Sequence, residues 1–207
     1  MDVGRIECEM AVKSGANIVG VLGAANVATI KECVAAAQNY GAKIMVDLIE
    51  VDDYLARAKQ MEELGVHYLG IHTSIDEQMS GKITFEKVKQ ITQTVSVPVA
   101  VAGGLNSANV AEAVQSGAQI VVIGGAITKS ADARGAVMQI RKAIDNLTVI
   151  ETELYRRVDL AHIKEILMKV SSANISDAMH RFPALPGIKP LLSGRKVVGK
   201  AVTVRTA

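Results

Sequence analysis

Two glycine pairs are the residues whose types and spacing predict chemistry most directly. Gly103 and Gly104 follow one apolar run, and Gly124 and Gly125 follow the next apolar run of the chain. Glycine lacks a Cβ atom and tolerates positive φ, so backbone N–H groups in such turns can approach a ligand closely. Each pair shortly precedes a predicted helix, and helix N-termini favour anions. We therefore predict a phosphate site at the two pairs, although one pair alone would be explained as a tight strand-to-helix turn.

Two polar side chains could supply proton transfer close to that site. His72 directly follows the apolar run 68–71, and imidazole is the side chain best suited to proton transfer near neutral pH. Asp47 interrupts the apolar run 44–49, where a carboxylate must be paired or hydrogen-bonded because burying it bare is costly. We take both as catalytic candidates. The sequence leaves a purely structural role open for each of them, as a hydrogen-bonded core residue.

A repeated pattern of helix, glycine and apolar run would position these groups. A glycine stands where each helix ends and needs the left-handed conformation, and an apolar run starts two or three residues later. Strands are predicted at 18–22, 44–48, 67–72, 97–102 and 120–124, and helices at 4–14, 27–40, 52–64, 84–93, 107–116 and 131–145. Strict alternation predicts a parallel sheet, so the polar strand ends should meet at one edge.

The predicted fold class is α/β, a partial (β/α)8 TIM barrel of about five of the eight βα units. An Ala-, Val- and Gly-rich chain with 3% aromatic residues fits parallel strands that are buried on both faces. Five strands are too few to close a barrel. The sequence therefore leaves two possibilities: an open five-stranded sheet, or a barrel whose three N-terminal strands lie upstream of Met1.

The repeat of helix, glycine and apolar run ends after residue 146. This change predicts a first domain at 1–146 and a short α+β extension at 147–207. The extension should contain an amphipathic helix at 151–170, a short helix capped by Ser171 or Ser172, a proline-rich loop at 182–190 and a strand at 197–204.

The bulk composition excludes several classes of protein. A net charge of +2 gives no footprint for nucleic-acid binding. No apolar run approaches the roughly 18 residues of a membrane span, and the opening residues do not resemble a signal sequence, so we expect a cytoplasmic protein without a membrane partner. Cys8 and Cys33 fall in predicted helices without metal-binding spacing, so we expect two buried thiols, no disulfide and no zinc.

Five stretches together carry a resemblance: VLGAAN, IMVDLIEV, GIHTSIDEQ, VPVAVAGGLN and IVVIGGAIT. They resemble the 3-hexulose-6-phosphate synthases, (β/α)8 lyases of the orotidine-phosphate decarboxylase suprafamily, over residues 1 to about 145. The resemblance implies an Mg²⁺-dependent aldol reaction that joins formaldehyde to ribulose 5-phosphate, giving 3-hexulose 6-phosphate. It also implies a homodimer.

The resemblance also implies roles for individual residues. His72 corresponds to the active-site histidine, and Gly103, Gly104, Gly124 and Gly125 correspond to the phosphate cradle. Asp2 corresponds to the last acid of a D-x-K-x-x-D motif, which reaches the partner subunit's site. The first Asp and the Lys of that motif, and the family's metal-binding acids, would lie upstream of Met1.

The tail from about residue 150 resembles the beginning of RraA-like proteins through SSANISDAMHR, PGIKPL and VVGKAVTVRTA. This second resemblance implies that the synthase-like part belongs to a bifunctional fusion. Two other functions remain open at this point. The chain could be a non-catalytic phosphosugar-binding fragment, or an RraA-like regulatory or interaction protein.

Overall fold

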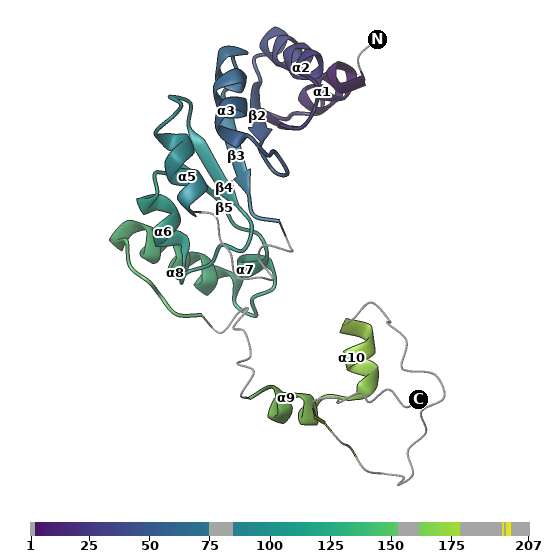
Figure 1. The fold of residues 1–207 in the computed structure, drawn as a ribbon, viewed down its shortest axis with the longest axis vertical. Helices are drawn as coiled ribbons and strands as arrows, with labels where there is room; N and C mark the ends of the chain where they lie inside the picture. The colour runs from purple at the N-terminus through teal and green to yellow at the C-terminus, as the bar shows by residue number, and fades with distance from the viewer. Residues whose placement is uncertain (1–2, 75–84, 153–161, 179–195, 197, 200–207) are drawn as a thin grey trace, which may run out of the picture. The chain divides into compact units, whose positions relative to one another are not determined.

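The computed structural model describes residues 3–74, 85–152, 162–178, 196 and 198–199 (Figure 1). The chain divides into two compact units, Met1–Leu154 and Tyr155–Ala207. Residues 147–152 lie with the first unit because two hydrogen bonds tie Ile150 to Ser107. The Ile150 N–H donates to the Ser107 carbonyl at 3.0 Å, and Ser107 Oγ donates to the Ile150 carbonyl at 2.8 Å.

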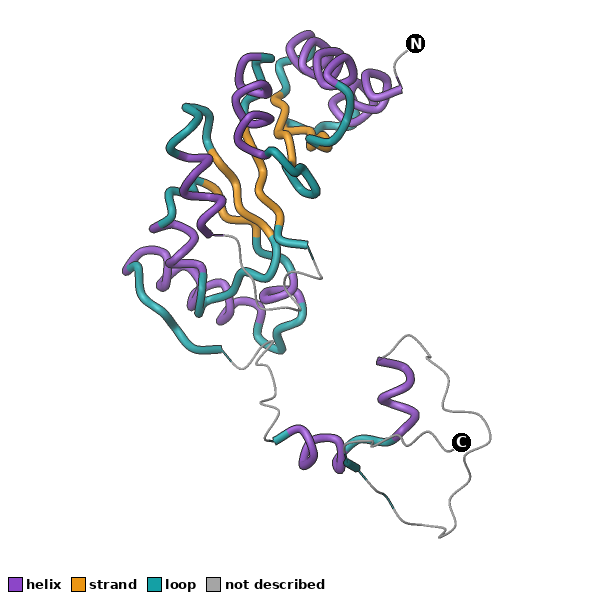
Figure 2. The backbone as a smooth tube through the Cα atoms, in the orientation of Figure 1, coloured by secondary structure: helices purple, strands orange, loops and turns teal. Residues whose placement is uncertain are grey.

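One parallel sheet organises the first unit, and its strands follow one another in the order β1-β2-β3-β4-β5 (Figures 1 and 2). Their bounds are β1 Ile18–Leu22, β2 Lys43–Asp47, β3 Tyr68–His72, β4 Val99–Ala102 and β5 Ile120–Val122. All four pairings are parallel. The five predicted strands and their parallel arrangement are therefore confirmed, with small shifts at the strand ends.

Helices alternate with these strands, as predicted. They are α1 Val3–Lys13, α2 Val27–Asn39, α3 Tyr54–Glu63, α5 Phe85–Thr92, α6 Val110–Gln115, α7 Gly125–Thr128 and α8 Ala133–Asn146. The sequence did not predict α7, because a four-residue helix is too short to show a 3.6-residue period. This helix lies where the sequence predicts a glycine-containing turn.

The glycine at the end of each repeated helix adopts the left-handed conformation that the repeat predicts. The φ angles are 104° at Gly15, 70° at Gly41, 81° at Gly65 and 98° at Gly117. A side chain is strained at such angles, so glycine there ends the helix and turns the chain into the next strand. The repeat is thus confirmed as a series of αβ loops.

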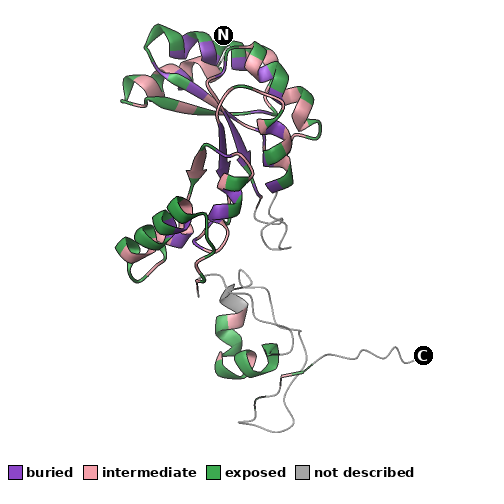
Figure 3. Cartoon of the chain, turned by 90° about the vertical axis from the view of Figure 1, so that its left-hand side faces the viewer, coloured by how far each residue is buried: buried purple, intermediate pink, exposed green. Residues whose placement is uncertain are grey.

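The helices bury one face of the sheet, and the other face stays partly open. In β2 the side chains of Ile44 and Val46 are buried, whereas Met45 and Asp47 alternate with them and keep some exposure. Figure 3 shows the buried residues gathered on the central strands and on the helix sides that face them. The prediction of strands buried on both faces holds for the interior strand β4, and it is wrong for the edge strand β1.

The edge strand β1 shows the difference from that prediction most clearly. Ile18, Gly20 and Leu22 share one face and are all exposed, whereas Val19 and Val21 pack against the core. Ile18 pairs with Lys43 and Leu22 with Asp47, so the open face runs on into β2. Within the described residues, no second layer covers this face, which also carries the candidate side chains.

The second unit contains α9 Ile163–Lys169 and α10 Ser172–Ala178. The short helix predicted after Ser171 is confirmed, and Ser171 Oγ accepts a hydrogen bond from the Asn174 N–H at 3.1 Å. The helix predicted at 151–170 is wrong at its start, because residues 151–152 are not helical. The loop predicted at 182–190 and nearly all of the strand predicted at 197–204 lie outside the described residues.

Among the helices that the structure describes, none has the length and apolar character needed to cross a membrane.

Candidate functional site

Asp47 and His72 meet at the carboxyl edge of the sheet. Asp47 ends β2 and His72 ends the neighbouring β3, and Asp47 Oδ2 lies 3.3 Å from His72 Nδ1. The other carboxylate oxygen, Oδ1, accepts a hydrogen bond from the Ile49 N–H at 3.0 Å. The side chains remain 42% exposed for His72 and 32% for Asp47, so both are accessible to a small substrate.

This geometry suits proton transfer. When Nδ1 of His72 carries its proton toward Asp47, the opposite ring nitrogen, Nε2, has a free lone pair and can take a proton from a substrate. The carboxylate stabilises the imidazolium that then forms, because opposite charges at this separation attract. Two residues that the sequence identified separately therefore form one acid–base pair.

The first glycine pair follows the strand next to His72. His72 pairs with Ala102 in the parallel ladder, and Gly103 and Gly104 continue directly from Ala102 with φ angles of 94° and 70°. Asn109 Nδ2 donates to the Gly104 carbonyl at 3.1 Å, which fixes the loop against the helix that follows. Adjacent strands lie about 4.8 Å apart, so this loop begins close to the imidazole.

The second glycine pair follows the next strand. Ala102 pairs with Val122, two residues before Gly124, so both pairs open at the same edge of the sheet. Gly124 is the N-cap of α7, and Gly125 is the first residue of that helix. A Cβ atom built on Gly124 meets no other atom within 4 Å, which means that this side of the backbone faces open space. The predicted convergence of the two pairs is confirmed; ligand binding there stays a prediction.

A cavity of about 220 Å³ lies beside His72. It is lined by the loop 48–52 after β2 and by Tyr54, Ile71, His72, Lys87 and Ile91. Glu50 in that loop holds a left-handed φ of 55°, which is uncommon for a residue with a side chain. Glu50, Asp52 and Lys87 are the charged groups that share this cavity with the imidazole.

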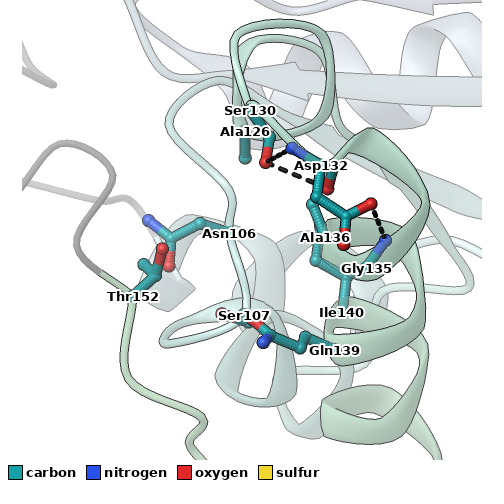
Figure 4. Close-up of a pocket in the computed structure, with 10 residues that line it drawn as sticks. All are labelled: Asn106, Ser107, Ala126, Ser130, Asp132, Gly135, Ala136, Gln139, Ile140 and Thr152. Carbon is teal, nitrogen blue, oxygen red and sulfur yellow. Dashed lines mark hydrogen bonds between the residues drawn. The ribbon is translucent and has the colours of Figure 1, made fainter.

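A second cavity, shown in Figure 4 and of about 260 Å³, lies between α7, α8 and the loop after β4, and neither Asp47 nor His72 lines it. Polar groups on its wall hold the chain together. Asp132 Oδ1 accepts from the Gly135 N–H at 2.9 Å, and Asn106 Oδ1 accepts from the Ala108 N–H at 2.8 Å. Because these groups cap a helix and close a loop, we keep Asp47 and His72 as the candidate site.

The remaining residues singled out by the sequence separate into two cases. Asp2 lies outside the described residues, so its catalytic role stays a prediction. Cys8 and Cys33 are buried free thiols, and Cys8 Sγ donates to the Cys33 carbonyl at 3.6 Å.

A magnesium site requires several oxygen ligands. Across the parts of the chain that the structure describes, no group of three or more His, Cys, Asp or Glu residues could hold a metal ion. Asp47 already accepts a backbone hydrogen bond with one oxygen and faces His72 with the other. The described residues do not fit a complete Mg²⁺ site by themselves.

Sequence reasoning missed two residues that shape this edge of the sheet, Gly23 and Arg57. The Gly23 N–H donates to the Asp47 carbonyl at 2.6 Å, and Arg57 Nε donates to the Gly23 carbonyl at 2.8 Å. Gly23 follows β1 as the glycine pairs follow β4 and β5, so its position after a strand was a usable signal. The sequence contains no comparable signal for Arg57, because an arginine on an amphipathic helix is ordinarily a surface residue.

Comparison with known proteins supports the arrangement. The family model described as orotidine 5'-phosphate decarboxylase / HUMPS family matches residues 1–140. The 3-hexulose-6-phosphate synthase of Methylomonas aminofaciens is 42% identical over 141 residues, 68% of this chain and 68% of that relative. The 3-hexulose-6-phosphate synthase of Bacillus subtilis is 39% identical over 145 residues, 70% of this chain and 69% of that relative.

A solved structure agrees with the sequence comparisons. The crystal structure of 3-hexulose-6-phosphate synthase from Salmonella typhimurium has a TM-score of 0.67 and 34% sequence identity, covering 71% of this chain and 70% of that one. This likeness confirms the prediction that the five βα units form part of a TIM-barrel-like fold. The chain belongs to the orotidine 5'-phosphate decarboxylase / HUMPS family.

Proposed function

We propose that this protein is a 3-hexulose-6-phosphate synthase, an aldehyde-lyase that interconverts ribulose 5-phosphate plus formaldehyde with D-arabino-hex-3-ulose 6-phosphate. The observation that carries the proposal is the Asp47–His72 pair, which lies at the sheet edge shared by both glycine pairs. Relatives at 42% and 39% identity bear the name of this activity.

His72 acts as the proton shuttle in the proposed reaction. Its imidazole takes a proton from C1 of ribulose 5-phosphate, and the electron pair of that C–H bond forms an enediolate with the neighbouring carbonyl. The C1 carbon then attacks formaldehyde and forms the new carbon–carbon bond. The formaldehyde oxygen receives the electron pair of its double bond and takes the proton back from the imidazolium. Asp47 orients the ring throughout and stabilises its charged form.

The glycine pairs anchor the phosphate in this proposal. Gly103 and Gly104 on one loop, with Gly124 and Gly125 on the next, offer backbone N–H groups without side chains in the way. A phosphate held there is remote from the reacting carbon, so its binding energy positions C1 beside His72.

Magnesium dependence stays part of the proposal as a prediction. When bound, Mg²⁺ would supply a Lewis acid for the enediolate oxygens. We assign no described residue to it and no step through it. If the activity needs the ion, EDTA should abolish turnover and added Mg²⁺ should restore it.

The edge strand β1 bears on the assembly of the protein. The open edge of β1 leaves backbone groups unpaired within the described residues, and unpaired edges favour association. We propose a cytoplasmic homodimer, with Asp2 contributing to the partner's site. Light scattering at several protein concentrations tests the dimer.

For the second unit we propose that it is the beginning of an RraA-like domain and that the protein is a bifunctional fusion.

The decisive experiment combines binding and turnover. Calorimetry measures the affinity for ribulose 5-phosphate, and consumption of formaldehyde measures the synthase reaction in the presence of Mg²⁺. Turnover that requires both substrates supports the proposal. Binding without turnover would instead indicate a non-catalytic phosphosugar-binding protein, and absence of both would overturn the phosphate site as well.

A further inference from the structure

Arg57 joins α3 to the loop that follows β1. Its Nε donates to the Gly23 carbonyl at 2.8 Å, and its Nη2 donates to the Ala25 carbonyl. Its Nη1 donates to Gln60 Oε1 on the same helix. Arg57 is partly buried, and each of its three side-chain nitrogens donates a hydrogen bond to the protein. The side chain is therefore engaged in holding the loop, unlike a solvated surface arginine.

Gly23, which accepts from Arg57, also contacts the end of β2. The Gly23 N–H donates to the Asp47 carbonyl at 2.6 Å. A Cβ atom at Gly23 would stand 2.7 Å from the same carbonyl oxygen, closer than real Cβ atoms come, and a tight 3.0 Å from Leu48 Cδ2. The peptide of Gly23 is thus held between Arg57 and Asp47, with no free space on the Asp47 side.

Asp47 is held from its other side as well. The Leu48 N–H donates to the Gly70 carbonyl at 2.8 Å, and Asp47 Oδ2 faces His72 Nδ1 at 3.3 Å. The end of β2 therefore lies between two supports. β3 fixes one of them, and the loop after β1, which Arg57 holds, fixes the other.

We propose that Arg57 is a positioning residue for the Asp47–His72 pair. It acts through the backbone of Gly23 and does not touch the substrate. Catalytic groups must be held within a fraction of an ångström, and a small displacement of Asp47 would misalign the imidazole. The catalytic part of this inference rests on the proposed synthase function, whereas the structural part, Arg57 to Asp47, does not.

The chemistry of the guanidinium explains why an arginine stands here. Two carbonyls of different residues, Gly23 and Ala25, accept from two nitrogens of one rigid planar group. A lysine ammonium is a compact charge on a flexible stem and cannot reproduce this fork. Arg57→Lys should therefore retain the fold and part of the stability while losing most of the positioning.

The structural test is independent of activity. Backbone amide and imidazole resonances are recorded by NMR for the wild type, for Arg57→Met and for Arg141→Met. Arg141 is a matched control because it is an exposed helical arginine that pairs only with Asp145 on its own helix, among the contacts the structure describes. Arg57→Met should move the amide signals of Gly23 and Asp47 and the ring signals of His72. If the Asp47 and His72 signals stay as in Arg141→Met, the proposal is overturned.

The kinetic test separates positioning from general stability. Arg57→Met should lower kcat by about tenfold while the KM for ribulose 5-phosphate changes less than about twofold, because the glycine pairs are untouched. In an Asp47→Asn background the same substitution should cause no further loss, since there is then no carboxylate to position. Equal losses in both backgrounds, or an effect on KM alone, would overturn the positioning role.

The two proposals can fail separately. A wild-type protein that does not turn over would reject the synthase function, while the NMR comparison would still decide whether Arg57 positions Asp47. A wild-type enzyme with full activity and an Arg57→Met variant with unchanged kcat would reject only the positioning role.

Discussion

Asp47 and His72 contact each other diagonally across two parallel strands. Asp47 is in register with Gly70, so His72 lies two residues further along β3 on the same face of the sheet. The carboxylate reaches forward to Nδ1 of the imidazole at 3.3 Å, and Gly70, which lies opposite Asp47 on that face, carries no side chain. No side chain of β3 therefore stands between the carboxylate and the imidazole.

The first prediction concerns His72. His72→Ala should lower kcat by ~10²-fold or more, the usual scale for losing a positioned acid or base, with little change in phosphosugar affinity. His67→Ala is the matched control, because His67 Nδ1 accepts from the Ile44 N–H at 3.2 Å at the opposite end of the strands. It should reduce stability and leave kcat nearly intact. A His72→Ala enzyme with wild-type kcat would make His72 a structural residue.

A second prediction addresses the phosphate cradle. Gly125→Val should weaken ribulose 5-phosphate binding strongly, since a branched side chain at the start of α7 would fill the space proposed for the phosphate. Gly20→Val is the control, because a Cβ atom there meets nothing within 4 Å and the residue lies in a strand. Titration calorimetry measures both. Equal affinities in the two variants would place the phosphate elsewhere.

Gly23 provides a stability prediction. Gly23→Ala should lower the free energy of unfolding by about 1–3 kcal/mol, the usual cost of forcing extra atoms into a packed site. The clash is with the Asp47 carbonyl oxygen, a backbone atom that cannot rotate away. Gly20→Ala has open space and should change stability far less. Urea unfolding of the two variants gives the comparison, and equal midpoints would contradict the close contact.

The fourth prediction concerns the Cys8 thiol. Burial raises the pKa of this thiol above its ordinary value, the hydrogen bond to Cys33 opposes that change, and the nearby Glu9 carboxylate adds to it. The native thiol should therefore remain protonated near pH 8 and react slowly with a thiol reagent, becoming fast only on unfolding. A fast native reaction at Cys8 would contradict its burial.

The same shift has a consequence for stability. A thiol whose pKa is raised in the folded state keeps its proton where the unfolded chain has lost it. Stability is then fully present below the ordinary pKa of the thiol and is lost as the pH rises from that value through the raised pKa of the folded state. Cys8→Ala should flatten this part of the pH dependence of the unfolding free energy.

The sequence predicted the repeated units well because each boundary has a local cause. Gly15 and Gly117 turn the chain at positive φ, and apolar runs bounded by such turns are identifiable without tertiary information. The edge at which Asp47 and His72 lie follows from the same alternation. Their contact could not be predicted, because it depends on a register offset of two residues between β2 and β3.

Two other features were beyond the sequence for different reasons. The exposure of Ile18 and Leu22 depends on what covers the second face of the sheet, which no local pattern reports. The role of Arg57 depends on carbonyl groups of residues more than thirty positions away in the chain. Long-range contacts to backbone atoms leave no compositional signal.

The strand order also bears on how the chain acquires its structure. Among the residues that the structure describes, each strand pairs with its neighbours in the chain, as Ile18 does with Lys43 and Ala100 with Ile120. Each of these pairings closes a loop of about one βα unit, so a strand can pair as soon as the unit that follows it has been made. During synthesis, β1 and β2 can therefore pair before β5 has left the ribosome, and the sheet can grow one βα unit at a time.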